Sequence, residues 1–178
     1  ERLISDVLLA ALSTGGDFAE IFAEDTFNTV IRMINGTVEE AVAGRDYGVG
    51  IRIFQGNQSV YAYTNDTARA NLMRVALEAA TALEDAPRIK SIVLARLAVP
   101  KFNRVELEPR KIAPKDKVGI MKTAHLAAFN YHEQISQVTL SYLDSTQNVL
   151  IANSEGLIAE DRRVRTRLGI QAVATKGP

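Results

Sequence analysis

The stretch FNTVIRMINGTVEEAVA, residues 27–43, decides the fold class. Its first eight residues are rich in β-branched and aromatic side chains, which favour strands. Asn35-Gly36 follows at once and supplies the positive φ angles of a tight hairpin turn. The remaining residues are therefore expected to return antiparallel to the first eight.

Strand patterns continue on both sides of this hairpin. Toward the N-terminus, Ala19, Ile21 and Ala23 occupy alternate positions. Toward the C-terminus, residues 49–53 form another alternating run, and a turn at Gly56-Asn57 leads to a returning run at residues 60–63. Four or five strands in succession predict an antiparallel meander.

Two helices are expected to cover one face of this sheet. Residues 2–13 have apolar side chains at helical spacing and are followed by Gly15-Gly16, which end the helix. A second, Ala-rich helix is expected to be capped by Asn65 or Asp66 and to end near Asp85, ahead of Pro87. Its apolar stripe is Leu72, Val75, Ala76, Ala79, Ala80 and Leu83.

The second half begins after a stretch that contains four prolines, residues 86–114, which we interpret as a linker. Pro114 suits the first position of a helix, and this helix is expected to continue to about Tyr131. Alternating runs at residues 138–142 and 149–151 predict two strands with a turn at Asp144-Ser145 between them, and a third strand at residues 164–172.

The predicted fold class is therefore α+β, with antiparallel β-sheets and helices packed on them. The predicted organisation is a helix–meander–helix subdomain at residues 1–85, the linker at 86–114, and a helix followed by strands at 115–178. The chain begins with Glu1 rather than Met and ends in mid-pattern at Lys176-Gly177-Pro178, so we expect a fragment of a longer protein.

Composition excludes several functions. The chain has no Cys, which excludes disulfides, thiolate catalysis and Cys-ligated zinc. Its 21 basic residues are balanced by 21 acidic residues, which argues against direct nucleic-acid binding and an anionic membrane partner. No apolar run approaches the ~20 residues that span a bilayer, and no signal peptide is visible, so we expect a cytoplasmic protein.

One dipeptide, His132-Glu133, suggests a zinc peptidase. A zincin helix needs a second His one turn later, so that two imidazoles face one metal ion. The positions that would supply it are Ser136 and Gln137. His125 borders the apolar stripe of the same predicted helix and is expected to be a packed, hydrogen-bonded histidine. The sequence therefore predicts no metal-binding, catalytic or cofactor-binding residue in this chain.

Two further patterns are ambiguous. Gly48-Val49-Gly50 resembles a phosphate loop but leads into a strand rather than a helix, so we interpret the glycines as a bulge or a close approach of the backbone. Arg163, Arg165 and Arg167 point to one side of a strand. They suit a peptide carboxylate, an acidic partner or a phosphate, but also a solvated sheet face or a guarded edge strand.

Several short segments, taken in order, resemble the N-terminal region of the TldD/PmbA family, also called modulators of DNA gyrase. The resemblance spans nearly the whole chain, and the segments near Ala62 and Asn153 are more similar to the TldD branch. The segments are Gly16-Asp17-Phe18-Ala19-Glu20-Ile21, Gly48-Val49-Gly50-Ile51-Arg52, Tyr61-Ala62-Tyr63-Thr64, Asn153-Ser154-Glu155-Gly156 and Asp161-Arg162-Arg163-Val164-Arg165.

The resemblance implies a cytoplasmic zinc metallopeptidase several hundred residues long. TldD-like subunits carry a His-Glu-x-x-x-His zinc motif downstream of the region matched here, act on small peptides or unfolded proteins, and pair with a PmbA-like subunit or with themselves. No motif residue can be transferred to this chain, because Gln137 stands where the second His would fall. The fragment alone is expected to be inactive and to contribute to the substrate chamber and to subunit contacts.

The alternative hypothesis is a non-enzymatic interaction or regulatory module of the gyrase-modulator type, with the Arg163–Arg167 face as its contact. An independent small enzyme is disfavoured, since no convergent set of titratable residues is visible.

Overall fold

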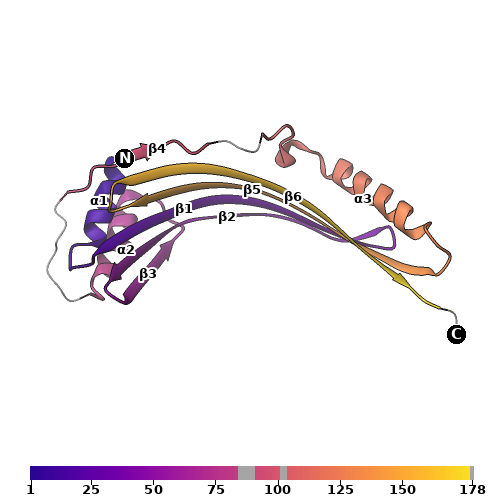
Figure 1. Cartoon of the computed structure of the whole chain (residues 1–178), viewed down its shortest axis with the longest axis horizontal. Helices are drawn as coiled ribbons and strands as arrows, with labels where there is room; N and C mark the ends of the chain where they lie inside the picture. The colour runs from indigo at the N-terminus through magenta and orange to yellow at the C-terminus, as the bar shows by residue number, and fades with distance from the viewer. Residues whose placement is uncertain (84–90, 101–103, 177–178) are drawn as a thin grey trace. The chain divides into compact units, whose positions relative to one another are not determined.

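The structure, a computed structural model, describes residues 1–83, 91–100 and 104–176. The described part contains one sheet in the strand order β3-β2-β1-β5-β6-β4, with helices packed on it (Figure 1). In chain order the elements are α1 (Arg2–Ala11), β1 (Phe18–Ile34), β2 (Thr37–Gln55), β3 (Gln58–Thr64), α2 (Arg69–Ala80), β4 (Ala95–Leu97), the 3₁₀ helix η1 (Pro109–Lys111), α3 (Pro114–Phe129), β5 (Ile135–Asn153) and β6 (Leu157–Ala174).

The predicted α+β class is confirmed. Strands β2 and β3 pair antiparallel, with Ile51 opposite Ala62. One pair departs from the antiparallel pattern, because β4 runs parallel to β6, with Ala95 opposite Leu157. This short strand lies in the stretch that the sequence indicated as a linker.

The strands are longer than predicted, and the meander contains three strands rather than four or five. Residues 27–34 and 19–23 belong to one strand, β1, and β2 continues without a break through Gly44. Gly44 has no positive φ angle, so it does not turn the chain. The turn predicted at Asp144-Ser145 is wrong, since both residues lie within β5.

The hairpin between β1 and β2 is confirmed. Asn35 and Gly36 have φ angles of 46° and 83°, which are the left-handed values that a two-residue turn requires. The Asn35 side-chain oxygen also accepts a hydrogen bond from the Val138 N–H at 2.9 Å, and the Asn35 N–H donates to the Val138 carbonyl at 2.9 Å. The turn residue therefore ties the β1–β2 hairpin to β5.

The chain divides into two compact units, each built from three separate segments. Strands β1, β2, β5 and β6 contribute residues to both units. Unit 1 consists of Glu1–Asp25, Asp46–Phe102 and Asn148–Arg162, and unit 2 of Thr26–Arg45, Asn103–Gln147 and Arg163–Pro178. The division at residues 86–114 that the sequence suggested stays a prediction.

Unit 1 is held together by α1 and α2, which pack on each other and on the sheet (Figure 1). Leu8 of α1 and Ala76 of α2 are fully buried, as are Ile51 and Ile53 of β2. Burial of a Leu or Ile side chain contributes roughly 1.5–3 kcal/mol, so this cluster carries much of the unit's stability. The predicted cover of one sheet face by these two helices is confirmed.

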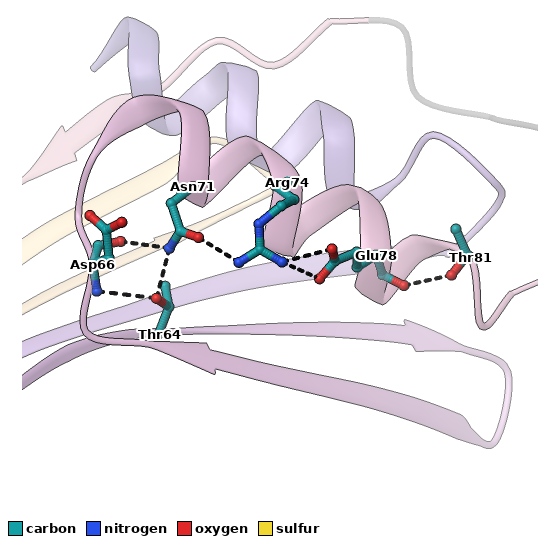
Figure 2. A network of polar contacts seen from close by, with 6 residues as sticks. All are labelled: Thr64, Asp66, Asn71, Arg74, Glu78 and Thr81. Atoms are coloured by element: carbon teal, nitrogen blue, oxygen red, sulfur yellow. Dashed lines mark hydrogen bonds and ion pairs between the residues drawn. The ribbon is translucent and has the colours of Figure 1, made fainter.

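Helix α2 begins later than expected, and its first turn is organised by a polar network (Figure 2). The N-cap residue is Ala68, not Asn65 or Asp66. The Asp66 carboxylate instead accepts the N–H of Ala68 at 2.9 Å, which places a side-chain-stabilised turn before the helix. The Thr64 hydroxyl oxygen accepts a hydrogen bond from the side-chain amide of Asn71 at 2.8 Å. The helix ends at Ala80 rather than near Asp85, and Asp85 and Pro87 lie outside the described residues.

Unit 2 is organised around α3, which begins at Pro114 as predicted. Its Met121 is fully buried against Ile31 and Met33 of β1 and Leu140 of β5. These contacts define the face of the sheet that α3 covers. No helix in the described ranges is long and apolar enough to cross a membrane.

Candidate functional site

His132 lies outside any helix, because α3 ends at Phe129. Its side chain is exposed, and its Nδ1 accepts the N–H of Gln134 at 3.1 Å. His132 therefore lies beyond the helix that carries His125. This hydrogen bond helps to shape the turn that leads into β5.

His125 is on α3 and packs against the β1–β2 hairpin. Its ring covers Gly36 and lies 5.5 Å from the Phe129 ring. The predicted packing is confirmed, but the predicted hydrogen bond is not found at Nδ1, which is buried and has no partner among the described residues.

The described side chains do not fit a zinc ion. A catalytic zinc site needs three protein ligands around one position. Within residues 1–83, 91–100 and 104–176, no group of three or more His, Cys, Asp or Glu residues is placed to hold a metal ion. His132 and His125 face different surroundings, the first a solvent-exposed turn and the second the Gly36 hairpin.

Gly48 and Gly50 serve a close approach, as interpreted from the sequence. They lie within β2, and a Cβ on Gly48 would collide with the Tyr63 hydroxyl, while one on Gly50 would collide with that of Tyr61. The Tyr63 hydroxyl donates to the Tyr47 carbonyl at 2.9 Å. The glycines thus let two tyrosines of β3 lie flat over the neighbouring strand, and they open no helix that could bind a phosphate.

The three arginines of β6 lie on the sheet face opposite α3. Thr166, which alternates with them, is hydrogen-bonded to Tyr142, a buried residue of the cluster under α3. Side chains alternate between the faces of a strand, so Arg163, Arg165 and Arg167 point the other way. Arg165 and Arg167 are exposed, and Arg163 is half-buried.

A buried ionic pair, which the sequence analysis missed, lies beneath α3. Lys117 Nζ is 2.5 Å from Asp144 Oδ2, and the two side chains are only 4% and 2% exposed. Nζ also approaches the Thr29 hydroxyl at 3.5 Å and lies 5.6 Å from the centre of the Tyr142 ring. The pair joins α3, β5 and β1, because each contributes one of these polar groups.

Tyr142 shares this environment. Burial is the largest cause that raises the pKa of the Tyr142 hydroxyl, to about 12. The hydrogen bond to Asp144 and the negative charge of Asp144 raise this pKa further, while a hydrogen bond from Thr166 lowers it. The hydroxyl of Thr146, on the same face of β5, is buried and has no partner among the described residues. The cluster has the features of a structural polar core.

The sequence did contain a signal for this cluster. Val138, Leu140 and Tyr142 occupy the alternate positions of β5 that face α3, and Asp144 continues the same alternation. An acidic residue in phase with buried residues indicates an inward-facing carboxylate that needs a partner. Because the sequence analysis assigned Asp144 to a turn, it predicted no buried partner for this carboxylate.

Comparisons with protein families place the chain among metallopeptidase domains. Residues 19–83 match the PmbA/TldA metallopeptidase domain 1, and residues 107–177 match the PmbA/TldA metallopeptidase central domain. The chain belongs to the TldD/PmbA family, and the resemblance noted from its sequence is confirmed.

Curated relatives agree with this assignment. The chain is 25% identical over 165 residues to a metalloprotease of Methanothermobacter thermautotrophicus, a match that covers 90% of this chain and 35% of the relative. It is 18% identical over 157 residues to a metalloprotease TldD homolog of Buchnera aphidicola, covering 88% of this chain and 32% of the relative. The chain therefore spans about a third of the length of these relatives.

Solved structures show the same fold. A candidate modulator of DNA gyrase from Bacteroides thetaiotaomicron superposes with a TM-score of 0.76 at 17% identity, over 98% of this chain and 41% of that one. TldE from Thermococcus kodakarensis superposes with a TM-score of 0.60 at 15% identity, over 91% of this chain and 37% of that one.

Proposed function

We propose that this chain is the N-terminal region of a TldD/PmbA-type metallopeptidase subunit and that it supports a catalytic site built elsewhere. One observation carries the proposal: a first and a central family domain follow one another in a chain whose described residues offer no metal-ligand set. The region supplies structure, and the hydrolytic chemistry belongs to residues outside it.

The metal of the longer protein is proposed to be zinc, held by a downstream His-Glu-x-x-x-His motif. The motif is an expectation from the family resemblance. A zinc ion held in this way would polarise a water molecule for attack on a peptide carbonyl. The lack of fit between zinc and His125 or His132 supports a location beyond this chain.

The chain is further proposed to contribute to the substrate chamber and to subunit contacts, with peptides or unfolded proteins as substrates. Sheet faces with exposed apolar side chains support this role. In unit 2 these side chains include Val38, Val42, Leu168 and Ile170, of which Val42 is 52% exposed and Ile170 50% exposed. The fold it shares with TldE makes a TldD/PmbA-like partner subunit, or a second copy, the proposed contact.

Metal analysis of the purified 178-residue chain tests the proposal. After dialysis against excess zinc and then metal-free buffer, inductively coupled plasma mass spectrometry is expected to find far less than one zinc per chain. The same chain is expected to leave unfolded casein intact. Stoichiometric zinc, or casein hydrolysis that phenanthroline stops, would contradict the proposal. A longer protein that includes the downstream motif is the positive control.

A further inference from the structure

Strand β6 has an outer edge that is largely unpaired in the described part of the chain. On its inner side β6 adjoins β5, and the Thr175 N–H donates to the Gln134 carbonyl at 2.8 Å. On its outer side the short strand β4 pairs only with Leu157–Ala159. The unit 2 segment of β6, from Arg163 to Ala174, therefore presents backbone N–H and C=O groups to which no described strand is paired.

The face beside this edge is positively charged. Ser141 of β5 lies against Gly169, which places the odd-numbered residues of β5 and β6 on one face, away from α3. Arg165 and Arg167 have no ion-pair partner among the described residues. Between these arginines and β1, strand β5 contributes Leu143, 40% exposed, and the uncharged Ser145.

Strand β1 adds a fourth arginine to the same face. Ile31 and Met33 are buried under α3, so Arg32 between them points to the opposite side, where it is exposed. We call this set of residues, Arg32, Arg163, Arg165 and Arg167, the arginine face. It places guanidinium groups beside a strand edge to which no described strand is paired.

We propose that the arginine face, together with the edge of β6 that no described strand pairs with, binds an extended acidic polypeptide segment, which adds to the sheet as a further strand. Alternate side chains of a strand lie about 6.8 Å apart, so carboxylates at every second position of the incoming segment match the spacing of Arg165 and Arg167. Guanidinium groups bind carboxylates in two-point contacts, and the strand edge supplies backbone hydrogen bonds.

A polypeptide fits these observations better than a nucleic acid. A polypeptide strand can pair with the N–H and C=O groups of the edge in the regular alternation of a β-ladder, which a phosphate backbone without N–H donors cannot form. The chain as a whole carries 21 basic and 21 acidic residues, so it lacks the excess of positive charge that drives binding to a phosphate backbone. This surface extends beyond the proposed peptidase role, because it requires neither zinc nor catalytic activity of the longer protein.

Fluorescence anisotropy with the full 178-residue chain tests the proposal. The probe is a short fluorescein-labelled peptide in which Glu alternates with Thr. We expect saturable, salt-sensitive binding that weakens roughly fivefold or more in the variant Arg165→Glu/Arg167→Glu, since two exposed ion pairs are replaced by repulsion. Arg165→Gln/Arg167→Gln provides a milder second variant, and circular dichroism verifies that each variant is folded.

Three controls define the outcome. Lys115→Glu/Lys122→Glu changes the same amount of charge on exposed positions of α3 and is expected to leave binding unchanged. A peptide with its glutamates in one block, and an alternating peptide N-methylated along its backbone, are both expected to bind weakly. The proposal would be overturned if the N-methylated peptide bound as well as the unmethylated one, or if the α3 variant lost as much affinity as the arginine variant. It would also be overturned if duplex DNA bound more tightly than the alternating peptide, or if that peptide did not bind. If the alternating peptide does not bind, the arginines are better explained as charges that prevent unwanted strand pairing at this edge.

Discussion

At the scale of single residues, the buried pair of Lys117 and Asp144 joins α3 to β5 where water has almost no access. Two opposite charges in such a place stabilise the fold little compared with apolar side chains of similar size, because both lose their hydration. Removal of one partner is different, since it leaves the other charge buried and unpaired. We therefore expect the pair to fix which position on α3 lies over which position on β5.

A double-mutant cycle tests this description. Lys117→Met and Asp144→Leu are each expected to lower the free energy of unfolding by about 3–5 kcal/mol, because each leaves an unpaired buried charge. The double variant is expected to recover most of that loss. Urea unfolding followed by circular dichroism measures all four proteins. Losses that simply add in the double variant would show that the two side chains do not act as a pair.

Tyr142 gives this cluster a signature in alkaline solution. The pKa of its hydroxyl is about 12 in the folded chain, raised first by burial and then by Asp144, against an ordinary value of 10.0. Between these values the unfolded chain releases the proton and the folded chain keeps it, so stability falls as pH rises. We expect unfolding free energy to drop over this window more steeply in the wild type than in Tyr142→Phe. Identical slopes would contradict the raised pKa.

The residue scale also shows where sequence reasoning stops. The closeness of Arg163, Arg165 and Arg167 on one face follows from strand alternation alone. The contact between Lys117 and Asp144 does not, since the two are separated by a helix end and a turn. Asp144 was in phase with buried neighbours, but an aspartate followed by a serine also has the composition of a turn. At Asp144-Ser145 the local preference for a turn conflicted with the burial of the strand, and the strand formed.

At the scale of elements, the β1–β2 hairpin depends on one glycine. Gly36 has a φ angle of 83°, and a Cβ there would lie 3.1 Å from a carbon of the His125 ring. Gly36→Ala is expected to destabilise the chain by about 1–2 kcal/mol, because L-residues other than glycine are strained in this conformation. Thermal unfolding by circular dichroism measures the change.

Gly44→Ala is the matched control for that substitution. Gly44 lies within β2, the strand that follows the Gly36 turn, has no positive φ angle, and has open space within 4 Å of the point that a Cβ would occupy. The substitution is expected to leave stability unchanged or to raise it by about 0.4–1 kcal/mol through the lower entropy of the unfolded chain. An equal loss from both substitutions would show that the turn geometry is not the cause.

Elements were predicted well where a local signal is sufficient. Asn35-Gly36 and Pro114 mark a turn and a helix start with residues that few other conformations favour, and both were correct. Strand lengths were underestimated, because Gly44 and Asp144-Ser145 resemble breaks. Whether a strand continues past such residues depends on the neighbouring strands, which a short window of sequence does not contain.

At the scale of the whole molecule, each compact unit draws on distant parts of the chain. The core of unit 1 contains Ala152 of β5 and Ile158 of β6, which are fully buried together with residues of α1 and α2. Residues 1–85 therefore lack part of their own core. The boundary that the sequence suggested at 86–114 describes composition, and its status as a folding boundary is open to experiment.

Fragments cut after Pro100 provide that experiment. Residues 1–100 alone are expected to show little native structure, and mixing them with residues 101–178 is expected to restore the circular dichroism spectrum of the intact chain. The physical reason is the missing burial from β5 and β6, at about 25 cal/mol for each Å² of apolar surface. Cooperative unfolding of residues 1–85 on their own would instead support the boundary taken from the sequence.

The parallel pairing of β4 with β6 has a consequence for biosynthesis. Ala95 lies opposite Leu157, so 62 positions separate the partners (157 − 95). On a ribosome that synthesises about 5–20 residues per second, the β4 segment is made roughly 3–12 s before its partner in β6. The nascent chain must keep this segment unattached in the meantime, and its attachment can only follow translation of β6.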